Sequence, residues 1–116
     1  MIASNLPAGR VLLFVVAGTY VLSAALLGFA RWRGAAVAWW VLVGWVATGV
    51  AGMALAASLR PGRPAVWAGL LLALGPWMLF SLAYDVRERV WVMAALDVAG
   101  LLAIAWGLGM ARAALR

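Results

Sequence analysis

The chain has 116 residues, of which 69% are hydrophobic and only 10% are charged, and its formal net charge is +6. This composition excludes an ordinary water-soluble domain, in which roughly half of the residues are apolar and about a quarter are charged. The absence of cysteine and histidine removes thiolate nucleophiles, imidazole bases and the commonest ligands of transition metals. We therefore expect no cofactor, no metal and no enzymatic activity.

Four apolar runs fill most of the chain, at residues 11–30, 35–59, 65–84 and 90–111. A helix needs about 20 consecutive apolar residues to cross the hydrocarbon of a bilayer, and each run meets that length. The connections are short, so consecutive helices should be antiparallel neighbours. The predicted fold class is an all-α membrane protein, with four transmembrane helices in an up-down-up-down bundle that forms a single domain over residues 1–116.

Residues 1–9 contain no basic residue, and the first run is longer than the apolar core of a signal peptide. We therefore expect the first span to be retained. The second run carries small residues at every fourth position, and the fourth run repeats this spacing: Gly44, Thr48, Gly52 and Ala56, then Ala95, Ala99, Ala103, Gly107 and Ala111. Small residues allow close helix packing in lipid, either within one bundle or between copies of it. Pro76 is expected to kink the third helix.

The arginines predict the orientation and the surroundings of the chain. Five of them fall on the side that would hold both termini, namely Arg10, Arg60, Arg63, Arg112 and Arg116, against four on the other side. The positive-inside rule then places the termini in the cytoplasm as part of a multi-pass protein of the cell membrane, with insertion in both orientations as the alternative. All nine basic residues are arginine, which is typical of a GC-rich bacterial genome. They stand singly or in pairs at helix ends, which favours lipid headgroups as partners and argues against nucleic acid.

Asp97 carries the sharpest chemical signal, because it is the only acid that lies well inside an apolar run. A charged side chain near the bilayer centre costs at least ~2.5 kcal/mol on insertion scales, so it marks a functional site by default. Counting from the middle of each run places Tyr20, Ser23 and Thr48 at a similar depth. The sequence therefore predicts a polar cluster of these three residues with Asp97, in which Ser81 could only flank. The cluster either exchanges protons or a cation, or it locks helix four to helix one.

Eight tryptophans are many for this length. Trp32, Trp39, Trp40 and Trp91 are expected in the interfacial belts. The deeper Trp45, Trp77 and Trp106 predict either bulky packing against small-residue faces or an aromatic wall for an apolar or cationic ligand. Asp85 and Arg89 are expected in a solvated turn, where an ion pair contributes little.

Two functions remain open from the sequence. The first is a non-enzymatic helical scaffold, an accessory or assembly subunit whose partners are other membrane subunits or further copies of itself. The second is a small oligomeric transporter, coupled to protons or another cation, that uses Asp97. Membrane lipids are expected partners in both.

Overall fold

The computed structural model describes residues 6–60 and 64–112, which form four α-helices and, within that part of the chain, no strand. The helices are α1 (Leu6–Trp32), α2 (Trp39–Ala57), α3 (Pro64–Arg87) and α4 (Trp91–Arg112). All four are long and apolar enough to cross a membrane. The prediction of an all-α membrane protein with four transmembrane helices is therefore confirmed. Arg63 and Arg116, which entered the orientation argument, lie outside the described residues.

Helix ends differ from the predicted runs, because a helix need not stop where its hydrophobicity stops. Helix α3 continues to Arg87, so Asp85 belongs to its last turn and not to a solvated loop. The chain then reverses at Arg89, which has a φ of 58°. The connection from α1 to α2 contains Gly34 with a φ of 102°, a conformation that favours glycine. Pro76 lies inside α3 without ending it.

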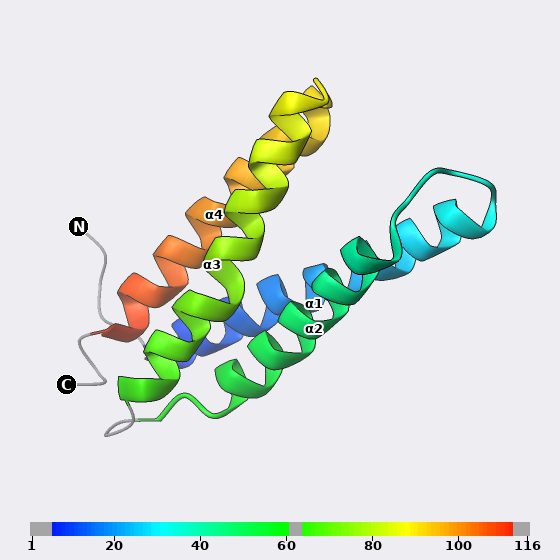
Figure 1. Cartoon of the computed structure of the whole chain (residues 1–116). Helices are drawn as coiled ribbons and strands as arrows, with labels where there is room; N and C mark the ends of the chain where they lie inside the picture. Colours follow the sequence, from blue (N-terminus) through cyan, green and yellow to red (C-terminus); the bar gives the residue numbers. More distant parts are fainter. Residues whose placement is uncertain (1–5, 61–63, 113–116) are drawn as a thin grey trace.

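The four helices form two hairpins, α1 with α2 and α3 with α4. Each helix of one hairpin also contacts one helix of the other, since α1 packs on α4 and α2 packs on α3. Figure 1 shows that the hairpins lie close together where α1 begins and α4 ends, and that they diverge toward the other end. We call these the closed end and the open end; the open end holds the connections at residues 33–38 and 88–90.

Close backbone contact joins α1 to α4 at the closed end. A Cβ atom added at Gly9 would lie 2.8 Å from the carbonyl oxygen of Gly107, and one added at Gly107 would lie 2.8 Å from Cγ of Leu13. Leu13 itself is fully buried. Because lipid supplies no hydrophobic drive between helices, such close van der Waals packing is a principal source of their attraction.

The small-residue stripe of α2 packs inside the bundle. Added Cβ atoms would collide with Trp77 at Gly44 and with Leu74 at Gly52, and Ala56 has no exposed surface. The stripe of α4 behaves differently along its length. Gly107 and Ala111 are buried at the closed end, Ala103 is partly buried, and Ala95 and Ala99 are exposed. The divergence of the hairpins thus leaves two of the five residues of the α4 stripe exposed.

Polar side chains connect helix ends at the closed end. The Arg10 guanidinium donates hydrogen bonds to the carbonyl oxygen of Leu59, with Nε at 3.1 Å, and so satisfies a carbonyl at the end of α2. Trp67 Nε1 donates to the carbonyl oxygen of Leu108 at 2.9 Å, and the Arg112 guanidinium lies 5.8 Å from the centre of a Trp67 ring. These arginines therefore contact the protein itself at the positions where we expected headgroup anchors.

The Gly9 contact yields a test with a control on the same helix. Gly9→Ala should lower the thermal unfolding temperature in detergent, because the added methyl overpacks a backbone contact, at a cost of about 1–3 kcal/mol. Gly18→Ala should be neutral or stabilising, since nothing lies within 4 Å of that position and alanine has the higher helix propensity. Equal unfolding temperatures for the two variants would contradict the close approach of α1 to α4.

Candidate functional site: two buried aspartates beside an aromatic pocket

The register of the α3–α4 hairpin determines which residues meet near the open end. Ser81 lies six residues before the end of α3, and Asp97 lies six residues after the start of α4. Ser81 Oγ donates a hydrogen bond to Asp97 Oδ1 at 3.1 Å. The same register places Gly100 against Met78, whose Cε would lie 2.6 Å from an added Cβ. Ser81, expected only to flank the site, is thus the hydroxyl partner of Asp97.

A second acid adjoins this pair. Asp85 lies one helical turn after Ser81 on α3, and its carboxyl is close enough to Asp97 to interact with it directly. Asp97 is 4% exposed and Asp85 is 9% exposed. Two of the chain's three acids are therefore buried side by side. The expectation that Asp85 is solvated is wrong, because the extra turn of α3 directs it toward α4.

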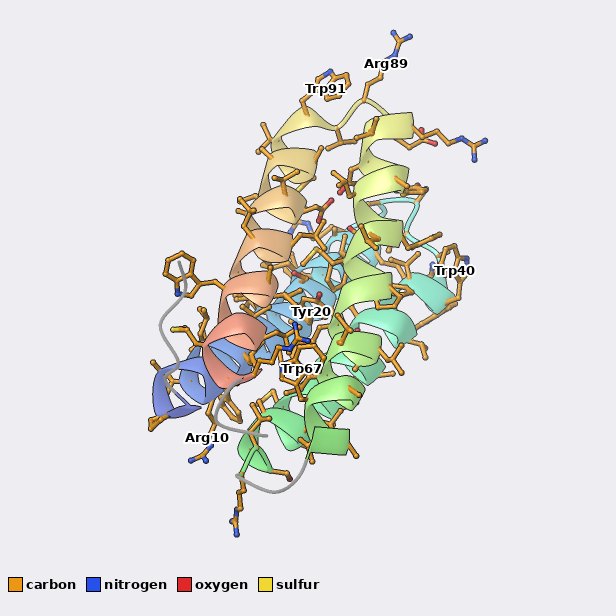
Figure 2. All side chains as sticks on the ribbon, turned by 90° about the vertical axis from the view of Figure 1, so that its left-hand side faces the viewer. Arg10, Tyr20, Trp40, Trp67, Arg89 and Trp91 are labelled. Carbon is orange, nitrogen blue, oxygen red and sulfur yellow. The ribbon has the colours of Figure 1, made fainter. Side chains whose placement is uncertain are left out.

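The pair has no cationic partner in the described part of the chain. No arginine there forms an ion pair with Asp85 or Asp97. Figure 2 shows Arg89 extending away from the helices at the tip of the α3–α4 hairpin, where it cannot neutralise the aspartates. Asp97 Oδ2 is buried without any hydrogen-bond partner. An unpaired polar atom in an apolar interior is costly and calls for an explanation.

The predicted cluster of Asp97 with Tyr20 is not formed through a hydrogen bond. Tyr20 is fully buried, but its hydroxyl donates to the carbonyl oxygen of Leu74 at 2.7 Å. Leu74 precedes Ser81 by seven residues, which is about 10 Å along a helix. The phenol therefore joins α1 to α3 at a level nearer the closed end, and the depth estimate from the sequence missed this offset.

Ser23 and Thr48 also fail to reach Asp97 by hydrogen bonds. The Ser23 hydroxyl donates to the carbonyl oxygen of Thr19 at 2.8 Å, and the Thr48 hydroxyl to that of Gly44 at 2.6 Å. Both bonds return to the helix that carries the side chain, which is how isolated hydroxyls in apolar helices are commonly satisfied. The prediction that these residues form one cluster is corrected accordingly.

A cavity of about 330 Å³ lies between the hairpins at the open end. Its wall combines residues from all four helices and both of the connections at that end: Leu27, Ala36, Val37, Ala38, Trp40, Val41, Trp45, Trp77, Phe80, Ser81, Tyr84, Asp85, Val90 and Met93. Asp85 is the one charged residue in this described lining, and Ser81 connects the cavity to Asp97. We call this the open-end pocket.

Aromatic rings form one continuous wall of the pocket. The ring centre of Trp77 lies 5.8 Å from that of Trp45 and 5.4 Å from that of Phe80, and Trp40 lies 5.5 Å from Phe80. Trp77 packs its six-membered ring on Gly44, so the glycine is what admits this side chain. Its Nε1 is buried and has no acceptor. Trp45 and Trp77 thus both line the pocket, and Trp77 also packs on a small residue.

One tryptophan assignment changes, and a second tryptophan also joins the pocket wall. Trp106 is 53% exposed and does not line the pocket, so its place in the predicted ligand wall is wrong. It faces away from the other helices because α4 buries the neighbouring Gly107 and Leu108 instead. Trp40, expected in an interfacial belt, contributes to the wall from the first turn of α2, where Figure 2 shows it at the side of the bundle.

The sequence contains a signal for the missed acid. Trp77, Ser81 and Asp85 are spaced four residues apart, so they share one face of a helix if α3 continues past Tyr84. No glycine or proline interrupts the chain between Gly75-Pro76 and the end of α3. Counting outward from the tight connection, instead of from the middle of each run, would have paired Ser81 with Asp97.

The chemistry of this site is limited by its donor set. Among the described residues no three groups of the metal-binding types gather, so a divalent-metal cage is not formed. Two adjacent carboxyls, one hydroxyl and ring faces can instead hold protons or a cation of single charge.

Comparison with known proteins found no matching family model and no significant match to a curated protein or a solved structure.

Removing the Ser81 hydroxyl should destabilise the protein. Ser81→Ala leaves Asp97 without its hydroxyl donor, and an unsatisfied buried group costs about 1–3 kcal/mol. Thr48→Val, which removes a hydroxyl bonded only to its own helix, should change the unfolding temperature in detergent far less. If Thr48→Val were as damaging as Ser81→Ala, the cluster predicted from the sequence would be favoured over the observed pairing.

Proposed function

We propose that this integral membrane protein binds a cation of single charge in the open-end pocket and exchanges it for a proton at Asp85 and Asp97. The observation that carries the proposal is the burial of two adjoining carboxyls, without a cationic side chain from the described residues beside them, next to a cavity that one of them lines. We also propose that it is a multi-pass protein of the cell membrane with cytoplasmic termini, the orientation that the positive-inside rule favours.

Electrostatics supports an exchange mechanism. Two like charges close together repel strongly in a medium of low dielectric constant, which favours a proton or a cation between them. Either a proton remains on the pair or a cation enters beside it. Because both occupants neutralise the same charge, binding of the cation expels the proton, and protonation expels the cation.

Transport requires that the site reach both sides of the membrane. The pocket lies at the open end, whereas at the closed end Gly9 and Gly107 bring α1 and α4 into contact. We infer that passage of a cation involves movement of the α1–α2 hairpin against the α3–α4 hairpin, in a protein that works as an oligomer. The exposed Ala95 and Ala99 offer a small-residue face of α4 for contact with another copy.

A scaffold or accessory subunit of a membrane complex is the second candidate. The same exposed part of the α4 stripe supports it, since a helix of another subunit could pack there. That role needs no chemistry from the aspartates. The two candidates therefore differ in what neutralisation of Asp85 and Asp97 should do.

Proton exchange can be measured in liposomes that contain the purified protein and a trapped pH indicator. Addition of an external cation should move protons outward when the cation fits the site, and the cations to be compared are Na⁺, K⁺ and tetramethylammonium. Asp85→Asn and Asp97→Asn should abolish the pH change, because each removes one of the two like charges whose repulsion keeps the exchanged proton on the pair. The measurement is the initial rate of change of the indicator signal.

Glu88→Gln is the matched control, since it neutralises the remaining acid of the chain, which is exposed. It should retain the exchange. Gel filtration and thermal unfolding of each variant would establish that it is folded. If no cation moved protons through the native protein, or if both aspartate variants stayed active, the exchange proposal would be wrong and the scaffold would be favoured.

A further inference from the structure

We infer that the ligand of the open-end pocket is an organic ammonium with an apolar body, held by its positive charge between Asp85 and the tryptophan rings. This inference rests on the proposed function and specifies its substrate class. The same chemistry occurs in free amines and in trimethylammonium lipid headgroups.

The donor set of the pocket suits an ammonium better than a bare metal cation. Hard cations take several oxygen ligands in a close shell. Of the described lining side chains, the oxygens come from Ser81, Tyr84 and Asp85 alone, while aromatic and aliphatic groups cover most of the wall. Ring faces attract a poorly hydrated cation through their quadrupole, and tryptophan does so best. One carboxylate then supplies the neutralising charge.

The arrangement of the rings points to the same class. Trp77 lies roughly perpendicular to Trp45, with an interplanar angle of 84°, and Trp40 is perpendicular to Trp77 at 83°. These edge-to-face contacts fix the orientation of the three rings, and all three border the pocket, so a cation inside it would lie against an aromatic surface. Asp85 lies two turns after Trp77 on the same helix face. The carboxylate and the rings therefore border one cavity.

The size and place of the cavity are consistent with an amphiphilic ligand. About 330 Å³ is near the lower limit for small-molecule pockets and about ten times the share of a water molecule in the liquid. Lining residues from both of the open-end connections show that the cavity reaches the level of those connections. In a membrane that level is the headgroup region, where amphiphilic cations concentrate.

The test is equilibrium dialysis of the full chain in detergent with radiolabelled benzyltrimethylammonium. Saturable binding is expected. Trp77→Leu should weaken it by about 2- to 30-fold, the range of a cation–π contribution, and Asp85→Asn by at least as much. Trp106→Leu is the matched control, because it removes a tryptophan that lies outside the pocket, and it should leave the affinity unchanged. Trp40→Leu is a second pocket variant in case Trp77→Leu fails to fold.

Competition identifies the class of ligand and its source. Uncharged 3,3-dimethylbutan-1-ol should not displace the label, whereas displacement would show a merely apolar pocket and overturn the inference. Displacement by Na⁺ or K⁺ at similar concentrations would also overturn it, while leaving the exchange proposal intact. Displacement by short-chain phosphatidylcholine, but not by phosphatidylglycerol, would support a headgroup as the source; displacement only by free ammonium compounds would support a soluble amine. Equal binding by Trp77→Leu, Asp85→Asn and the native protein would contradict the site.

Discussion

Close contact between the backbones of α1 and α4 is the constraint on which the rest of the structure depends. In lipid, apolar side chains gain little by leaving their surroundings, so helices associate where small residues let them approach. Gly9 and Gly107 provide that approach at one end of the molecule. Larger side chains follow toward the other end, where Trp77 occupies the space above Gly44. The two hairpins are consequently joined at the closed end and separated at the open end, and the separation contains the pocket.

Hydroxyl groups inside the bundle follow a simple rule, which the buried acids and Trp77 Nε1 do not follow. The hydroxyls of Ser23 and Thr48 return to their own helices, and that of Tyr20 crosses from α1 to a carbonyl of α3. Each is thereby satisfied without water. Asp97 and Asp85 break the rule, since one oxygen of Asp97 has no partner and neither acid has a basic one among the described residues. A carboxyl in an apolar interior without a neutralising partner is costly in free energy, so the pair marks a functional site.

The sequence predicts much of the fold and only part of the site. Length and hydropathy identify the four spans, because a bilayer imposes both. They do not set the register between helices, which depends on where each helix ends. The last turn of α3 illustrates this, since its extension to Arg87 buries Asp85 and brings Ser81 level with Asp97. An apolar run also does not show which face of the helix packs against its neighbours. Trp77 and Trp106 both lie deep in apolar runs of the sequence. Trp77 packs inward against Gly44, whereas Trp106 is exposed.

The central claim is that Asp85 and Asp97 form one site at which a cation replaces a proton. Infrared difference spectroscopy tests it most directly, because the protonated carboxyl and the carboxylate have separate bands. On addition of benzyltrimethylammonium, the account predicts loss of a carboxyl band and gain of a carboxylate band, both absent from the double variant with Asp85→Asn and Asp97→Asn. Saturable binding without any change in these bands would contradict it.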